Sequence, residues 1–320
     1  MATVVDARPA RVGRVHTATE ERPQCHCASV AVLPDGSLFA AWFAGAFETA
    51  PDQAIVAASL PPGEDDWSEP WIVVDTPDRA DGQPVPWLAP DGKLWLFFVT
   101  LDGTDWTSAR LFRRVSPDLG RTWGESTSVV EEPGWMVRSR PLLALDGAIL
   151  LPAYEERTRR STVLRSDDGG EHWVRGAAIA TPAGNIHPTL LRRRDGALDA
   201  YLRSRGRMWR ATSDDDGRTW ASAEPTAIPN PDSGFDVMRT RDGTLVLAYD
   251  DSDSLRTPLR LARSTDEGAS WEPLATLEDE LAEFSYPALA EDGAGRVHCL
   301  YTARRTEIRE ATVDLRGTGR

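Results

Sequence analysis

The sequence predicts an all-β protein, a six-bladed β-propeller built from four-stranded antiparallel blades. Three observations lead to this prediction. A box of the form Ser-x-Asp-x-Gly-x-x-Trp occurs four times, starting at Ser116, Ser166, Ser213 and Ser264. Asp-Gly pairs that open a run of alternating apolar residues occur six times, at a similar spacing of about 50 residues. A fixed period in this range is typical of a repeat architecture.

Each Asp-Gly pair marks a β-hairpin between the first two strands of a blade. Glycine supplies the positive φ that such a tight turn needs, and strand-like segments stand on both sides, as in "ASVAVLPDGSLFAAWF". The six pairs begin at Asp35, Asp91, Asp146, Asp195, Asp242 and Asp292.

The tryptophan box lies between the third and fourth strands of a blade. "ARLFRRV" precedes the box at Ser116 and "STSVV" follows it. Serine and aspartate can bond backbone amides in a turn, while tryptophan anchors the turn against apolar neighbours. We therefore expect these boxes to be structural, with their aspartates remote from any ligand: Asp118, Asp168, Asp215 and Asp266.

The ends of the chain complete the ring in this prediction. Blade one has a box with one extra residue (Ser59 to Trp67), and blade six reaches only a third strand, "EIREATV". We expect residues near Val4 to Val12 to supply the missing fourth strand. Residues 1–320 then form a single propeller domain without an open sheet edge.

Composition narrows the range of partners and cofactors. A formal charge of −14 argues against nucleic acid and against an anionic membrane as a partner. No apolar run approaches the roughly 20 residues of a membrane span, and the first residues do not resemble a secretory signal, so a cytoplasmic protein is expected. Cys25, His26 and Cys27 lack a second cluster at ligand spacing, so we expect neither a metal nor another cofactor. The oligomeric state stays open.

The channel mouth is the expected functional region, because the first strand of every blade lines the channel. Polar residues precede each hairpin at equivalent positions, which is more than turn chemistry requires. They are His26, Gln83, Arg138, Arg140, Asn185, His187, Asp232, Asp236, Glu283 and Tyr286. A second set follows the second strands: Trp42, Glu48, Asp52, Tyr154, Glu155, Arg203, Tyr249, Asp250, Tyr301 and Arg304. Arginines beside carboxylates and tyrosines suit an anionic sugar.

The chain resembles the sialidase-like superfamily with Asp-box repeats, in particular its bacterial and plant branch of exo-α-sialidase-like proteins with BNR repeats. The resemblance covers nearly the whole chain and is most specific at "HCASVAVLPDGSLFAAWFAG", "NPDSGFD" and "EFSYPAL". It implies an exo-glycosidase in which three arginines hold the sugar carboxylate, a tyrosine paired with a glutamate is the nucleophile, and an aspartate is the acid/base.

The chain departs from this pattern at the first arginine, where "QCHCAS" stands in place of an Arg-Ile-Pro motif. Arg140, Arg203 and Arg304 could form a substitute cluster. Tyr286 or Phe284 could occupy the nucleophile position, and Glu48 or Asp52 could be the acid. Sialic acid is therefore one candidate, and another acidic or deoxy sugar is equally plausible.

Three functions follow from these residues. The first is a glycosidase that uses a carboxylate pair or a Tyr/Glu pair. The second is a lyase or other acid/base enzyme, with His26 or His187 as base, Tyr286 as proton donor and Arg140 against a uronate carboxylate. The third is a non-catalytic glycan-binding propeller.

For the first function, the catalytic candidates are Glu48, Asp52, His187, Glu283 and Tyr286. The substrate-binding candidates, for a small molecule or an oligosaccharide, are His26, Trp42, Gln83, Arg138, Arg140, Tyr154, Arg203, Asp236 and Arg304. We expect His26, Arg140, His187, Asp236, Glu283 and Tyr286 to converge on one pocket.

Overall fold

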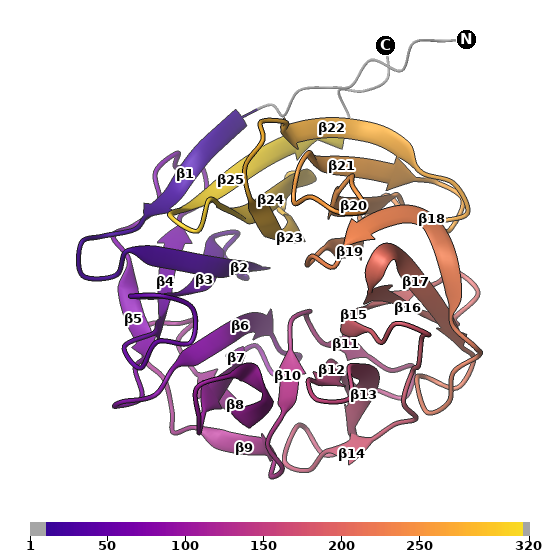
Figure 1. Cartoon of the computed structure of the whole chain (residues 1–320), viewed down its shortest axis with the longest axis horizontal. Helices are drawn as coiled ribbons and strands as arrows, with labels where there is room; N and C mark the ends of the chain where they lie inside the picture. The colour runs from indigo at the N-terminus through magenta and orange to yellow at the C-terminus, as the bar shows by residue number, and fades with distance from the viewer. Residues whose placement is uncertain (1–10, 316–320) are drawn as a thin grey trace.

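The computed structural model, which describes residues 11–315, confirms the predicted six-bladed propeller (Figure 1). Six antiparallel sheets surround a central axis, and in each sheet the strand nearest the axis comes first in the blade. The two strands on either side of each Asp-Gly hairpin are neighbours in every sheet, as the hairpin pattern predicts. Within residues 11–315, no helix is long and apolar enough to cross a membrane.

The first three blades follow one another along the chain. Blade one comprises β2 (Gln24–Val32), β3 (Leu38–Gly45), β4 (Ala54–Leu60) and β5 (Trp71–Val74). Blade two comprises β6 (Asp81–Leu88), β7 (Leu94–Leu101), β8 (Ala109–Ser116) and β9 (Thr127–Val130), with the short 3-10 helix η1 (Trp106–Ser108) before β8. Blade three has a divided inner strand, β10 (Trp135–Val137) and β11 (Leu142–Leu143), followed by β12 (Ile149–Glu155), β13 (Arg160–Ser166) and β14 (Val174–Arg175).

The last three blades bring the chain back to its start. Blade four comprises β15 (Ile186–Arg192), β16 (Leu198–Arg203), β17 (Arg205–Ser213) and β18 (Glu224–Pro231). Blade five comprises β19 (Asp236–Arg239), β20 (Leu245–Asp250), β21 (Leu259–Ser264) and β22 (Glu272–Glu278). Blade six comprises β23 (Phe284–Glu291), β24 (Arg296–Ala303), β25 (Glu307–Asp314) and β1 (Arg11–Thr17).

An N-terminal strand completes the sixth blade. β1 pairs antiparallel with β25, from Arg11 opposite Thr312 to Thr17 opposite Glu307. The strand expected near Val4–Val12 overlaps β1 only at Arg11 and Val12, and residues 4–10 lie outside the described residues. The observed pairing therefore uses a segment that extends further along the chain than the sequence pattern indicated.

The serine and aspartate of each tryptophan box form hydrogen bonds within the turn of that box. In the third blade, the Ser166 hydroxyl accepts a hydrogen bond from the Gly170 amide at 2.8 Å and donates to Asp168, also at 2.8 Å. Asp168 also accepts hydrogen bonds from the backbone amides of Glu171 and His172. The same serine–glycine and serine–aspartate bonds recur in the other three boxes.

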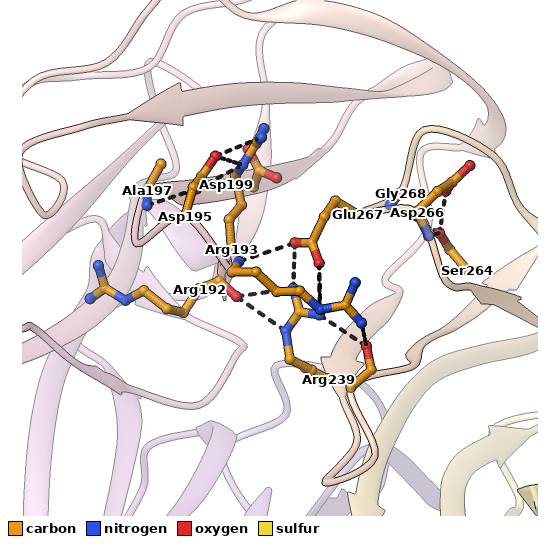
Figure 2. Close-up of polar contacts among 12 residues, drawn as sticks. Arg192, Arg193, Asp195, Ala197, Asp199, Arg239, Ser264, Asp266, Glu267 and Gly268 are labelled. Atoms are coloured by element: carbon orange, nitrogen blue, oxygen red, sulfur yellow. Dashed lines mark hydrogen bonds and ion pairs between the residues drawn. The ribbon is translucent and has the colours of Figure 1, made fainter.

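The boxes also join neighbouring blades. Trp123 of blade two packs against Phe39 of blade one, with ring centroids 6.0 Å apart, and Trp173 of blade three packs against Phe97 of blade two. Figure 2 shows the box of blade five, where Glu267 pairs with Arg239 at 2.6 Å while Arg239 also donates to a carbonyl of blade four. This geometry agrees with a structural role for the boxes.

Candidate active site

Four of the six inner strands share the same irregularity near the start of the strand. The backbone φ is positive at Cys27 (61°), Gln83 (52°), His187 (50°) and Tyr286 (53°), and the pairing register shifts at each of these points. Positive φ is uncommon outside glycine, and such strained residues cluster at functional sites. The ends of the inner strands that open away from the hairpins thus form the candidate site.

Tyr286 and His187 are linked through one buried arginine at this mouth. Arg203 Nη1 lies 3.3 Å from the Tyr286 hydroxyl oxygen and 3.3 Å from His187 Nδ1. His187 Nε2 lies 3.0 Å from the Tyr154 hydroxyl. Because the guanidinium donates to Nδ1, this network assigns the imidazole proton to Nε2, which donates to Tyr154.

Both mouth histidines are buried and neutral. Burial, followed by the charge of Arg203 and its neighbours, holds the pKa of His187 well below its ordinary value. Burial and the charge of Arg305 do the same for the pKa of His26. The His26 ring lies edge-to-face against Tyr286 with centroids 4.6 Å apart, and neither ring nitrogen has a hydrogen-bond partner among the described residues.

Asp232 and Glu283 stand around this floor, each held by two arginines. Asp232 accepts from Arg203 at 3.0 Å and from Arg159 at 2.9 Å. Glu283 accepts from Arg256 at 2.7 Å and from Arg305 at 3.0 Å. Burial opposes the ionisation of both carboxyls, but the arginines outweigh it and keep both pKa values below the ordinary value. Both carboxylates are therefore ionised at neutral pH.

Glu48 completes this half-exposed rim. It bonds Trp106 Nε1 at 3.1 Å and also pairs with Arg305. Gln53 fixes the loop that carries Glu48, because its side chain bonds the Thr49 amide and the Asp81 carbonyl oxygen. The rim therefore comes from loops after the second strand of blade one and around the inner strands of blades five and six.

Two further carboxyls near the mouth have raised pKa values. Burial raises the pKa of Glu156, although the charges of Arg159 and Arg203 lower it. Burial also raises the pKa of Asp250, to about 7, although the Ser233 hydroxyl and Arg256 oppose it. A carboxyl that keeps its proton near neutral pH can act as a general acid. Sequence reasoning named the neighbour Glu155 and missed Glu156.

The structure brings together much of the predicted set and adds Cys27. His26, Tyr154, His187, Arg203 and Tyr286 meet at the floor, while Glu48 and Glu283 stand at the rim. Gln83 is buried beside them, with Oε1 3.1 Å from Cys27 Sγ. The residue with positive φ precedes a proline in three of these strands, as Gln-Pro in "GQPVPW", His-Pro in "NIHPTLL" and Tyr-Pro in "EFSYPAL". An alignment of these pairs would have pointed to Cys27 in blade one instead of His26.

Arg140 and Asp236 lie away from this group. They pair with each other at 2.8 Å, and Asp236 also accepts from the Leu289 amide. Arg140 lines a channel cavity of about 410 Å³ at the opposite, hairpin ends of the inner strands. Of the six residues expected to converge on one pocket, Arg140 and Asp236 are therefore absent from it. They pair with each other across the channel, deeper than the mouth.

Three other predicted residues also lie elsewhere. Trp42 is fully buried between blades, stacked on His16 with ring centroids 5.1 Å apart. Asp52 turns back on its own loop, where it accepts from the Ala46 amide. Arg304 is half-exposed and pairs with Glu280. Their side chains are thus occupied by packing, loop closure and surface pairing.

Arg138 is buried beneath the floor and does not point into the mouth. Its Nη2 donates to the carbonyl oxygens of Ala28 and Tyr286, both at 2.9 Å. Its guanidinium carbon lies 5.4 Å from the centroid of the Tyr286 ring. The side chain expected to bind substrate is therefore engaged with protein backbone.

Comparison with known proteins supports the fold. Residues 36–299 match the family model described as a BNR repeat-like domain. Among curated proteins, no sequence relative matches the chain.

Solved structures give the same result. The Hadza microbial sialidase Hz136 is 18% identical with a TM-score of 0.83, over 95% of this chain and 68% of that one. An intramolecular trans-sialidase from Ruminococcus gnavus is 13% identical with a TM-score of 0.77, over 95% and 97%. A protein of unknown function from Dyadobacter fermentans is 17% identical with a TM-score of 0.80, over 95% and 98%. At these identities the similarity establishes the fold alone.

Proposed function

The chain belongs to the BNR repeat-like family, and from this premise and the geometry of its mouth we propose that it is a carbohydrate-active enzyme. It would cleave the glycosidic bond of a terminal acidic sugar. The observation that carries the proposal is Tyr286, held at a strained backbone position on the channel floor with its hydroxyl bonded to the buried Arg203. The similarity of the fold to sialidases and a trans-sialidase supports the same class of substrate.

The charge balance of the mouth suits an anionic substrate. Five guanidinium groups face or underlie it, against three ion-paired carboxylates. The arginines are Arg138, Arg159, Arg203, Arg256 and Arg305, and the carboxylates are Glu48, Asp232 and Glu283. The protein as a whole carries −14. A local excess of positive charge within an acidic protein attracts a carboxylate to this mouth, where guanidinium forks can bind it.

The side chains of the mouth can support hydrolysis. The Tyr286 oxygen would attack the anomeric carbon while its proton passes to His26, whose neutral ring packs edge-to-face against the Tyr286 ring. Glu156, with its raised pKa, would protonate the leaving oxygen. Water would then attack the anomeric carbon, giving one proton to Glu156 and its hydroxyl to the sugar, while His26 returns the first proton to the departing tyrosine oxygen.

Elimination is the second candidate, and one observation favours it. Within residues 11–315, the hydrogen-bond partner of the Tyr286 hydroxyl is Arg203, with no carboxylate beside it. The Tyr/Glu nucleophile pair implied by the resemblance is therefore not formed here. A tyrosine and a neutral histidine next to arginines can instead remove the proton adjacent to a uronate carboxylate and return a proton to the leaving oxygen.

Product analysis tests the proposal and separates the two reactions. Purified protein would be incubated with a panel of acidic and deoxy-sugar glycosides and acidic oligosaccharides, and the products measured by mass spectrometry. Hydrolysis adds one water to the fragments, whereas elimination gives an unsaturated product that absorbs in the ultraviolet.

Tyr286→Phe should lower kcat on the substrate found by about 100-fold or more. Tyr301→Phe is the matched control, because Tyr301 is a buried tyrosine of blade six whose hydroxyl bonds Glu278 of blade five, in the core between these two blades. This control should keep its turnover per folded molecule. Failure of every glycoside in the panel, or full turnover by Tyr286→Phe, would show that the assignment is wrong.

A further inference from the structure

Arg138 connects three blades below the reaction site. It follows β10, at the break in the inner strand of blade three, and is 3% exposed. Its Nη2 reaches Ala28 of blade one and both Tyr286 and Pro287 of blade six, always at the carbonyl oxygen, over 2.9 to 3.2 Å. One side chain thus ties down the backbone of two other blades.

These carbonyls belong to the strained segments of the mouth. Ala28 follows Cys27, whose φ is 61°, and Tyr286 itself has a φ of 53°. A residue keeps such a conformation only where its surroundings over-determine it. The Arg138 guanidinium is one such constraint, and it lies on the floor side of the Tyr286 ring.

Stability alone does not account for a buried charge at this place. Among the described residues, no carboxylate pairs with Arg138. A buried charge without a counter-ion is costly, and a hydrophobic side chain of similar length is often no less stable at such a site. The charge therefore has a use other than holding the blades together.

We propose that Arg138 is the positioning residue of this site, which holds the strained backbone under Tyr286 and sets a fixed positive charge below the floor without touching the substrate. Its effect on turnover rests on the proposed function, whereas its effect on the protein's own side chains does not.

The fixed charge acts on both mouth histidines. Arginines surround each ring, so that both imidazoles stay neutral, with burial as the larger cause. His187 lies near the charges of four arginines, the Tyr154 hydroxyl and the Tyr286 ring; these arginines are Arg138, Arg159, Arg203 and Arg256. His26 lies beside the Tyr286 ring and near the charges of Arg138, Arg203, Arg256 and Arg305. Removal of the Arg138 charge should raise the pKa of both histidines, while burial and the remaining arginines limit the rise.

Two substitutions test the proposal by kinetics. Arg138→Met keeps much of the volume but removes the charge and the three carbonyl bonds, and it should lower kcat by about 100-fold with KM changed by no more than about threefold. Arg138→Lys keeps the charge but cannot reach all three carbonyls, so its kcat should lie between those of wild type and Arg138→Met.

The matched control is Arg113→Met. Arg113 is another buried arginine, 4.3 Å from the Trp95 ring centroid, but it lies between blades two and three. This control should lose stability and keep its kcat.

A titration followed by NMR of labelled histidine tests the proposal without any substrate. His26 and His187, assigned by single substitutions, should stay neutral well below the ordinary imidazole pKa in the wild type and begin to protonate at higher pH in Arg138→Met. If this shift occurs and no glycoside is cleaved, the proposed function fails and the positioning role stands. If Arg138→Met folds, keeps the wild-type histidine titration and matches the wild-type kcat on a substrate found, Arg138 is not a positioning residue.

Discussion

A comparison of substitutions at Asp232 and Asp102 would measure how much burial adds to the energy of an ion pair in this protein. Each carboxylate bonds two arginines. Asp232 holds Arg159 and Arg203, and Asp102 holds Arg79 and Arg110. The two sites differ mainly in exposure: the Arg203 side chain is 9% exposed, whereas those of Arg79 and Arg110 are 52% and 35% exposed.

Asp232→Ala should lower the free energy of unfolding by about 3 kcal/mol. The reason is that Arg203 would keep its buried charge and lose the one carboxylate that it pairs with among residues 11–315, which is the costly way to break an ion pair. Arg159, 32% exposed, adds little to this cost. Asp102→Ala breaks the same number of pairs but leaves both arginines to water, so it should cost no more than about 1 kcal/mol.

Equilibrium unfolding in urea at neutral pH and moderate salt would give both values, provided that the slope with urea concentration is unchanged. Added salt should reduce the cost of Asp102→Ala and leave most of the cost of Asp232→Ala, because buried pairs are screened less. Equal costs for the two substitutions would refute the reasoning, since burial would then not decide the energy of these pairs.

Two other predictions concern the frame. Ser166→Ala removes the acceptor of the buried Gly170 amide and should cost about 1–3 kcal/mol of unfolding free energy with turnover per folded molecule unchanged; a selective loss of turnover would contradict the structural role of the box. Around the buried His298, hydrogen bonds hold the pKa of Asp292 at about 2 and that of Glu310 below its ordinary value, although burial opposes both. The contribution of these two carboxylates to the free energy of unfolding is complete above their unfolded pKa near 4 and is lost as pH falls toward 2. Urea unfolding should therefore give a lower free energy of unfolding at pH 3 than at pH 7, and His298→Ala should make this difference smaller.

The fold was predictable because its signals are local and repeated. A hairpin needs only an Asp-Gly turn between alternating runs, and the box needs only a serine, an aspartate, a glycine and a tryptophan at fixed offsets. Six repeats of the same pattern leave little freedom in topology. The closing strand was placed less well, because a strand that pairs with the far end of the chain has no turn to fix its register.

The site was harder to predict, because its geometry depends on register and on distant partners. A register shift of one residue turns a side chain toward the other face of a strand, and the inner strands carry such shifts where Cys27 and Tyr286 leave the regular β conformation. Arg140 and Arg138 stand two residues apart in the same motif, yet one pairs with Asp236 in the channel and the other binds backbone under Tyr286. Nothing in the local sequence distinguishes these outcomes.

The charge distribution connects the frame to the proposed chemistry. The boxes use their aspartates to accept hydrogen bonds from turn amides, which places negative charge at the outer turns of four blades. Five arginines lie at the mouth, where Arg203 and Arg305 bond rim carboxylates beside the floor. A long polyanion lying across the molecule would meet the acidic turns, whereas a single anionic terminal group could enter the mouth, where guanidinium groups outnumber the ion-paired carboxylates. This asymmetry favours action on the end of an acidic glycan over binding along its length.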